Sequence, residues 1–262
     1  MIICPKCKKE LFKIDHAYQC NNNHNYDIAK SGYVNLLLSR FNAGDNKEML
    51  SARDDFLRQN YYFPIVKAVA SKIVIFNPLI VDCGCGTGYY IDCLSQILSG
   101  RFIGVDISKI AVDFAAKKNK NILYLVASNS NLPLADGSID ILLNIFAPYS
   151  DSEFARTLSN EGKLITVTAN TNHLQELKQI VYDIPHTNID KLYFLPSFKL
   201  IHEEILEYNM ILTQRDLISL FRMTPYSFKT KNSDFEKLFH VDVLEVTASF
   251  SIKEYQKQTK LY

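Results

Sequence analysis

The stretch Leu79-Ile80-Val81-Asp82-Cys83-Gly84-Cys85-Gly86-Thr87-Gly88-Tyr89-Tyr90 decides the fold. An apolar run ends in an acid, and three glycines follow at alternate positions before a helical segment begins. Glycine adopts backbone angles that other residues avoid, so a ligand can approach the main chain. A glycine turn that opens a helix also directs free N–H groups at that ligand. We therefore predict an α/β fold with a nucleotide-type pocket on the first strand of a doubly wound sheet.

The chain after this turn alternates between strand and helix patterns, as expected for βαβ units. We predict strands at Leu79–Asp82, Arg101–Asp106, Leu123–Ala127, Ile139–Ile145 and Gly162–Thr168, with helices between them. Further strands are predicted at Phe198–His202, Glu204–Leu212 and Val241–Ile252, where they would complete the sheet. The pattern predicts a mostly parallel sheet with helices on both faces.

Composition indicates an ordinary globular chain of 262 residues, 47% apolar and 22% charged, with a net charge of +1. No apolar run reaches the roughly 18 residues that span a bilayer, and the first residues do not form an apolar signal segment. We therefore expect a cytoplasmic protein without a membrane partner. This net charge creates no overall positive potential that would attract nucleic acid. Residues 1–41 nevertheless carry six Lys or Arg against three acids, an excess that suits either phosphate contacts or a solvated face.

The first residues contain four metal-ligand side chains in the order Cys4-x2-Cys7-x12-Cys20-x3-His24. Two close pairs joined by a short spacer are typical of a structural tetrahedral zinc site. The spacer predicts a small hairpin that needs the metal to fold. The alternative is three unrelated buried cysteines and a surface histidine. His16 is a rival ligand, but it lies in the middle of the spacer and we expect it to be exposed.

The glycine spacing separates two kinds of nucleotide pocket. A dinucleotide pocket needs G-x-G-x-x-G/A after a strand; counted from Gly84 or Gly86, the sixth position is Tyr89 or Ile91. The pattern acid-x-Gly-x-Gly-x-Gly instead resembles the first motif of class I S-adenosylmethionine-dependent methyltransferases. Asp106 ends the second strand, where a carboxylate can accept both ribose hydroxyls; its alternative role is a helix-capping surface acid.

The loop after the fourth predicted strand, Asn144–Pro148, contains no cysteine. Methylation of a pyrimidine ring carbon generally requires a cysteine nucleophile, so that chemistry is not indicated. The Asn/Asp-Pro-Pro-Tyr/Phe motif of amino-group methyltransferases is also absent. Direct attack by a ring nitrogen, an oxygen or another heteroatom remains, and for this the protein mainly aligns donor and acceptor.

The whole chain resembles the bacterial 23S ribosomal RNA guanine-N1 methyltransferases. The resemblance rests on the Cys4/Cys7/Cys20/His24 set, Gly32–Leu37, Gly44-Asp45, Asp82–Tyr90, Ala127-Ser128, Leu132-Pro133, Ala147-Pro148, His173–Lys178 and Met223–Tyr226. It implies a Rossmann-like class I methyltransferase domain with a small N-terminal zinc-binding domain. The implied domains are a zinc-binding RNA-recognition module (1–38), a linker (39–78) and the methyltransferase domain (79–262).

The resemblance also implies the activity, which is transfer of a methyl group from S-adenosylmethionine to N1 of a guanine in a hairpin loop of 23S RNA. It further implies that the enzyme forms a homodimer. The predicted cofactor-binding residues are Tyr62, Asp82, Gly84, Gly86, Thr87, Gly88, Asp106, Ser128 and His173, and the predicted zinc ligands are Cys4, Cys7, Cys20 and His24. No catalytic residue is assigned. Tyr62 has an alternative role as a core aromatic, and His173 as a helix-start residue.

Three further expectations concern RNA and rival functions. Tyr33, Tyr149 and Tyr226 are candidates for base stacking. One rival function is methylation of a small metabolite, with the zinc module as a lid. The other is non-catalytic RNA binding on the same fold, which the intact glycine turn and Asp106 disfavour.

Overall fold

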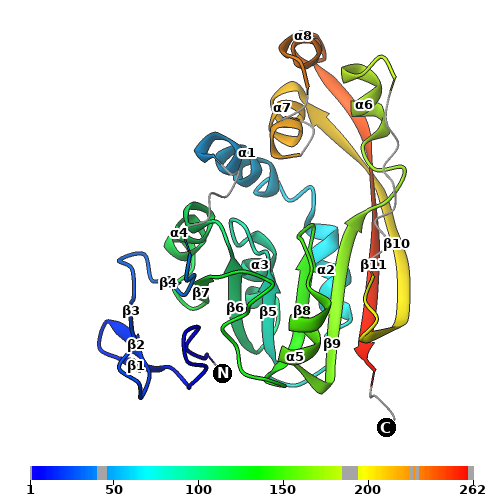
Figure 1. Ribbon diagram of the computed structural model, residues 1–262. Coiled ribbons are helices and arrows are strands. Elements are labelled where there is room, and N and C mark those ends of the chain that lie inside the picture. Colours follow the sequence, from blue (N-terminus) through cyan, green and yellow to red (C-terminus); the bar gives the residue numbers. More distant parts are fainter. Residues whose placement is uncertain (1, 40–45, 185–193, 225–226, 228–229, 259–262) are drawn as a thin grey trace.

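The computed structural model describes residues 2–39, 46–184, 194–224, 227 and 230–258. Its strands form a small three-stranded sheet of order β1-β2-β3 and a large eight-stranded sheet of order β10-β11-β9-β8-β5-β6-β7-β4. The small sheet lies beyond the β4/β7 end of the large one (Figure 1). Of the segments named above, Arg40, Gly44-Asp45 and Pro225-Tyr226 lie outside the described residues.

The centre of the large sheet is parallel, as the strand-helix alternation predicts. The strands are β5 (Leu79–Cys83), β6 (Arg101–Asp106), β7 (Leu123–Val126), β8 (Ile139–Ile145) and β9 (Leu158–Ala169). β5 pairs in parallel with β6 on one side and with β8 on the other. The chain order therefore reverses at β5, and the crevice at the carboxyl ends of β5 and β8 is where open α/β sheets bind ligands.

Several of the helices begin at a polar residue whose side chain caps the first turn. The helices are α1 (Lys47–Leu57), α2 (Phe63–Ser71), α3 (Tyr89–Ile97), α4 (Lys109–Lys118), α5 (Asp151–Thr157), α6 (Gln175–Val181), α7 (Gln214–Met223) and α8 (Asn232–Glu236). The side chains of Asn46, Ser108 and Thr213 accept backbone N–H groups of α1, α4 and α7, respectively. These bonds satisfy donors that the first helical turn leaves unpaired. α1 lies across the end of the sheet (Figure 1).

The two strands near the C-terminus are longer than the sequence predicts. β10 (Phe198–Thr213) is one strand with an irregularity between Leu200 and His202, so the prediction of two separate strands is wrong. Glu203, the residue between the two predicted strands, faces β11 (Val243–Lys257), where it pairs with Lys253 at 3.3 Å. A charged residue on an exposed edge strand therefore does not end it.

Successive side chains of β5 enter different cores on the two faces of the sheet. Ile80 lies in the core that contains α2, α7 and β11 residues, whereas Val81 lies in the core that contains Phe154 of α5 and Leu11 and Cys20 of the N-terminal hairpin. This alternation is the period of two expected for a strand buried on both sides. The N-terminal hairpin therefore shares a core with one face of the large sheet.

The first 35 residues form a hairpin and then join the large sheet. β1 (Phe12–Ile14) pairs with β2 (Ala17–Gln19) around the predicted Asp15-His16 turn, and β3 (Asn25–Asp27) pairs with β2. β4 (Val34–Asn35) then pairs in parallel with β7. The end of the predicted 1–38 module thus forms the edge strand of the large sheet; the boundaries of the three predicted domains stay a prediction.

No helix in the described part of the chain is long and apolar enough to cross a bilayer.

Tyr124 of β7 fills space that two glycines leave open. A Cβ on Gly104 would lie 2.6 Å from the Tyr124 ring, and a Cβ on Gly88 would lie 2.7 Å from its hydroxyl oxygen. Tyr124 is 1% exposed. The ring therefore supports the glycine turn from below and fixes the residue type at both positions.

The Gly104→Ala substitution should lower the free energy of unfolding by about 1–3 kcal/mol, because overpacking forces neighbouring side chains to move. Urea titration measures the change. In a Tyr124→Leu background, where the ring is gone, the same substitution should cost less than about 1 kcal/mol. Equal losses in the two backgrounds would contradict this explanation.

Candidate functional site

The glycine turn between β5 and α3 has the backbone that its sequence predicts. Gly84, Gly86 and Gly88 have φ values of 91°, 52° and 80°, which favour glycine. A Cβ on Gly84 would lie 2.2 Å from the Cβ of Ala147, so the loop after β8 touches this turn. No described side chain caps the first turn of α3. Its N–H groups are therefore placed to bind a ligand at the carboxyl ends of β5 and β8.

Asp106 connects the end of β6 to this turn. Its two carboxylate oxygens accept the N–H groups of Gly86 and Ser108, each at 2.8 Å. The predicted ribose ligand thus lies at the glycine turn. Its bond to Ser108, the N-cap residue of α4, also fits the alternative role as a helix-capping acid, so the ribose role stays a prediction. A carboxylate offers about four acceptor sites, so these two bonds are compatible with a further ligand hydroxyl.

Asp82 is the group that fits a cationic ligand. It is 1% exposed, and neither carboxylate oxygen has a hydrogen-bond partner among the described residues. Burial, with a smaller contribution from Asp106, raises the pKa of Asp82 to about 8. A buried carboxylate without a donor is costly, and a positively charged ligand would offset that cost. S-adenosylmethionine carries both an amino group and a sulfonium, so the residues around the glycine turn fit this cofactor.

Tyr62 and His173, which are 111 residues apart, meet beside the loop after β8. Tyr62 caps α2 and His173 precedes α6, and their Oη and Nε2 atoms are 3.4 Å apart. Ser249 donates its N–H to Nδ1 of His173 at 3.3 Å, which places the imidazole proton on Nε2. Burial, and then the charge of Lys178, lowers the pKa of His173 to about 3. The imidazole is therefore neutral at pH 7.

Both members of this pair are buried, at 2% and 6% exposure. Their alternative roles, a core aromatic for Tyr62 and a helix-start residue for His173, thus agree with the buried positions of both side chains. A cofactor role for Tyr62, His173, Thr87 and Ser128 stays a prediction. Ser128 itself accepts the Ser130 N–H at 3.2 Å.

Phe146 lies in the same cluster and is missing from the predicted site. It follows β8 with a φ of 54° and is 44% exposed. Its ring centroid is 6.4 Å from that of Tyr62, 6.1 Å from Tyr90 and 5.5 Å from Phe250. Left-handed backbone at a bulky residue is strained and is common at functional sites. Its place directly after β8 is the signal that could have identified it.

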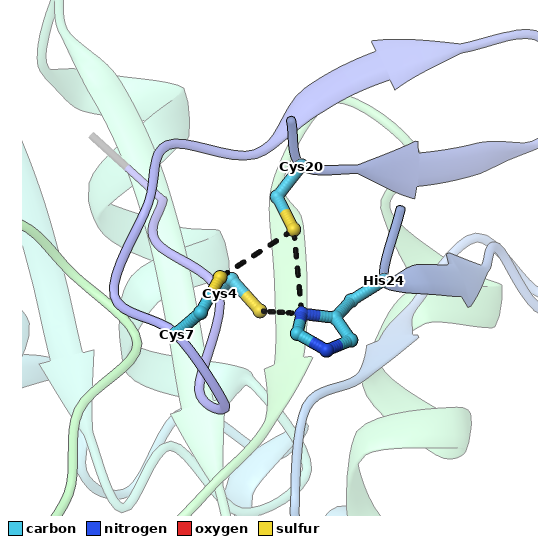
Figure 2. Close-up of side chains that lie close together, drawn as sticks. All are labelled: Cys4, Cys7, Cys20 and His24. Carbon is cyan, nitrogen blue, oxygen red and sulfur yellow. Dashed lines mark hydrogen bonds between the residues drawn. The ribbon is translucent and has the colours of Figure 1, made fainter. Parts of the chain in front are cut away.

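The predicted zinc ligands meet at one point (Figure 2). Their ligand atoms all lie within 4.8 Å of one another. Cys7 and Cys20 sulfurs are 3.6 Å apart, and Nδ1 of His24 is 3.4 Å from the Cys4 sulfur and 3.5 Å from the Cys20 sulfur. With usual zinc bond lengths, tetrahedral edges are about 3.8 Å between sulfurs and about 3.5 Å from sulfur to nitrogen. The four residues therefore fit zinc, and His16 is exposed as predicted.

Two tight turns bring these ligands together. In the first, Cys4 donates its N–H to the carbonyl of Lys9 at 2.7 Å. In the second, Asn23 donates its N–H to the carbonyl of Cys20 at 2.9 Å. Burial raises the pKa of the Cys4 thiol, but the Tyr26 hydroxyl, 3.3 Å from the sulfur, and nearby backbone groups outweigh it and bring the pKa to about 6. The thiolate is the form that binds metal. Tyr26 was not predicted, although it lies only two residues after His24.

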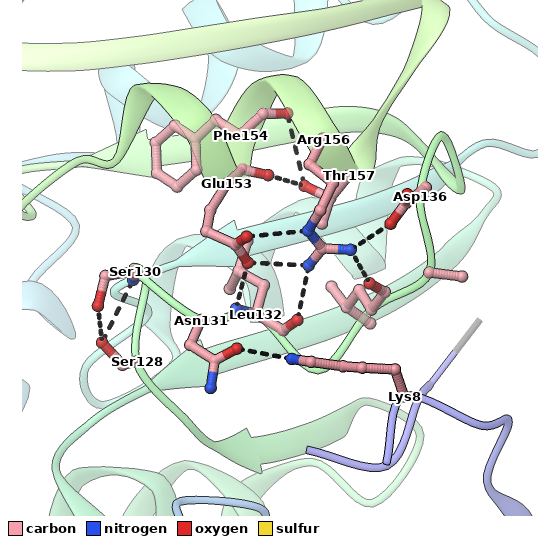
Figure 3. A network of polar contacts seen from close by, with 12 residues as sticks. Lys8, Ser128, Ser130, Asn131, Leu132, Asp136, Glu153, Phe154, Arg156 and Thr157 are labelled. Carbon is pink, nitrogen blue, oxygen red and sulfur yellow. Dashed lines mark hydrogen bonds and ion pairs between the residues drawn. The ribbon is translucent and has the colours of Figure 1, made fainter. Parts of the chain in front are cut away.

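The zinc hairpin is attached to the chain that follows β7 (Figure 3). Lys8 donates to the Asn131 side chain at 2.9 Å, and the Ile3 N–H donates to the Pro133 carbonyl at 2.9 Å. On the other side, Arg156 of α5 donates to the carbonyls of Leu132 and Leu134 at 2.9 and 2.8 Å. Residues 131–134 are thus held between the zinc hairpin and α5.

We expect about one zinc ion per chain in the purified protein, since one tetrahedral site is present. A Cys4→Ser/Cys20→Ser double variant should contain none, because serine is a poor zinc ligand. Elemental analysis by mass spectrometry measures the ratio. The Cys93→Ser variant, outside the cluster, is the control and should keep its zinc; equal zinc in both variants would overturn the assignment.

The pKa of Asp82 predicts a dependence of stability on pH. Because this folded pKa of about 8 exceeds the value of about 3.9 for an unfolded aspartate, the folded chain binds the proton more tightly. The Asp82 contribution to stability therefore falls as pH rises from about 4 to 8. Asp82→Asn should stabilise the cofactor-free protein by roughly 1–3 kcal/mol at pH 8, with almost no effect near pH 4.

Urea unfolding at several pH values tests this prediction, and the exposed Asp55→Asn variant is the control. A stability gain for Asp82→Asn that does not grow with pH would show that Asp82 is not the buried acid described above.

Comparison with known proteins agrees with this geometry. A family model described as RlmA, N-terminal, a zinc ribbon, matches residues 2–40, and a model described as Methyltransferase domain matches residues 80–162. The solved structure of YcgJ from Bacillus subtilis has a TM-score of 0.52 at 14% identity, over 74% of this chain and 98% of that one. These findings show the class I methyltransferase fold with an N-terminal zinc ribbon, and with them a domain that uses S-adenosylmethionine.

Two relatives carry the name "Putative 23S rRNA (guanine-N(1)-)-methyltransferase". The Micromonospora griseorubida protein is 34% identical over 198 residues, which are 66% of this chain and 67% of that protein. YxjB of Bacillus subtilis is 27% identical over 271 residues, which are 96% of this chain and 95% of that protein. The chain thus has the fold, the ribbon and the sequence of one group of enzymes, and it belongs to the 23S rRNA (guanine-N1)-methyltransferase family.

Proposed function

We propose that this protein transfers a methyl group from S-adenosylmethionine to N1 of a guanine in a hairpin loop of 23S ribosomal RNA. One observation supports the substrate most: the zinc ribbon and the methyltransferase pocket are parts of one packed unit. The glycine turn alone is common to methyltransferases with many acceptors. The ribbon, packed against residues 131–134 and the sheet, is what separates this chain from them.

The pocket residues suggest how the cofactor would be held. The Asp106 carboxylate would accept ribose hydroxyls, and the Asp82 carboxylate would face the positive end of the molecule. The N–H groups at the start of α3 and the Tyr62–His173 pair would close the pocket around it. Bound there, S-adenosylmethionine supplies an electrophilic methyl group.

Guanine N1 carries a proton and is a poor nucleophile until that proton leaves. His173 is not suited to accept it, because Nδ1 already accepts the Ser249 N–H and Nε2 carries the imidazole proton. The protein would therefore act mainly by aligning an unpaired base with the methyl group. No general base is assigned.

The rival functions fit the described structure less well. A lid over the pocket should lie at the carboxyl ends of β5 and β8, but the ribbon packs at the β4 edge and on one sheet face. Of the stacking candidates, Tyr33 is 7% exposed, so the expectation that it stacks on a base is wrong. Tyr149 is 38% exposed and stays a candidate. A ribosomal RNA substrate would support the expected cytoplasmic reaction, and the homodimer stays a prediction.

The test uses 23S RNA from a strain that lacks this protein, incubated with the purified enzyme and tritiated S-adenosylmethionine. Methylation of N1 blocks base pairing, so we expect label in the RNA and one new reverse-transcription stop at a hairpin guanine. Asp106→Ala should reduce the rate at least about tenfold through weaker cofactor binding, while exposed Asp55→Ala should not. Cofactor binding without label in the RNA would favour a small-molecule acceptor, and no cofactor binding would favour the non-catalytic alternative.

A further inference from the structure

A surface hollow of about 530 Å³ lies between the turn that leads into β4 and the last turn of α4. Its lining consists of small and charged residues, which are Ala29, Lys30, Ser31, Asp113, Lys117 and Lys120. No aromatic ring and no large apolar side chain lines it. The hollow is therefore unsuited to a base or an apolar ligand and suited to a small charged group.

The turn on one side of the hollow is fixed in place. Gly32 donates its N–H to the Ala29 carbonyl at 2.7 Å, and its φ of 107° favours glycine. Ser31 is 7% exposed and donates its hydroxyl to Oδ1 of Asp113 at 2.6 Å. Lys120 donates to the carbonyl of Ser31. These bonds join the turn to α4 and present exposed Lys30 at its tip before any ligand binds.

The hollow has an excess of positive charge. Lys117 donates to Oδ2 of Asp113 at 2.6 Å, so the single acid in the lining is already paired. Hydrogen bonds from Lys117 and Ser31 lower the pKa of Asp113, which keeps it ionised. Neither Lys30 nor Lys120 has a carboxylate partner among the residues that the structure describes. Three lysines against one aspartate leave two positive charges, more than the net charge of the whole chain.

We propose that this hollow binds a phosphate group of the RNA backbone, with Lys30 and Lys120 as its cationic ligands. The proposal rests on the proposed function and adds a contact outside the cofactor pocket. A lysine ammonium has three donors, so Lys120 can hold Ser31 and still contact an anion. The hollow is lined by the turn before β4 and by α4. β4 is the edge strand at the end of the sheet where the zinc hairpin also lies (Figure 1). A strand of RNA bound along this end would pass both.

A phosphate contact has a measurable signature, because binding releases counterions from the RNA. The slope of log affinity against log salt falls by roughly 0.7–1 for each contact that is lost. We therefore expect Lys30→Gln and Lys120→Gln each to reduce the affinity for a fluorescent 23S hairpin RNA about three- to tenfold near 0.1 M KCl. Each should also reduce the salt slope by about 0.7–1, equally for hairpins of different sequence. Fluorescence anisotropy over a KCl series measures both.

Lys199→Gln is the matched control, since Lys199 is exposed on β10, the opposite edge of the same sheet. It should leave the slope unchanged. Lys30 lies at the tip of a turn, so its replacement tests the contact without disturbing the Ser31 anchor; S-adenosylmethionine affinity, measured by calorimetry, should stay the same in all three variants. Slopes equal to that of the wild type in both Lys30→Gln and Lys120→Gln would overturn the proposal, as would an equal reduction in Lys199→Gln.

The source of the phosphate is tested separately, by titration with inorganic phosphate. If inorganic phosphate binds tightly and depends on Lys30 while the RNA slope is unchanged, the hollow binds a free anion and the RNA assignment is wrong. If the wild-type enzyme methylates 23S RNA but the salt slopes of Lys30→Gln and Lys120→Gln equal that of the wild type, only the phosphate proposal is wrong. A wild-type enzyme that transfers no methyl group to the RNA defeats the proposed function instead.

Discussion

The carboxylate of Asp106 is the group on which the site depends most. By accepting the N–H groups of Gly86 and Ser108 it joins the turn after β5, the end of β6 and the start of α4 in one rigid piece. Tyr124 supports that piece from below, where Gly88 and Gly104 lack side chains. The position of α3, the placement of Asp82 and the contact with Ala147 all follow from this arrangement, because the turn has little freedom to adopt another.

The same region carries features that do not stabilise the fold. Asp82 is buried without a donor among the described residues, and Phe146 holds a left-handed backbone. Each costs free energy in the absence of a ligand. Their concentration at one end of the sheet, next to a neutral His173 held by Ser249, is what physical chemistry expects of a site prepared for a bound molecule.

The sequence was sufficient wherever the deciding interactions are local. The glycine turn, the parallel strands and the four zinc ligands depend on residue type and short spacing, and the structure agrees with them. It was insufficient where tertiary packing decides. Tyr62 and His173, which only the family resemblance assigned to one site, meet across 111 residues. Tyr33 is buried by its neighbours, and β10 continues through Glu203, which pairs with Lys253 on the adjacent strand. None of these contacts has a periodicity or spacing by which a single sequence could reveal it.

The shared core beneath the zinc hairpin limits how this protein can be divided. Cys20 and Leu11 belong to the same apolar core as Val81 and Phe154, and β4 supplies the edge strand beside β7. The ribbon is therefore not a domain that could be replaced by another ribbon during evolution without changes in the methyltransferase domain. A chimera that joined the ribbon of another protein to this methyltransferase domain would need matching apolar surfaces where the two meet. The ribbon and the methyltransferase domain should therefore have diverged together, and chimeras between distant relatives should aggregate.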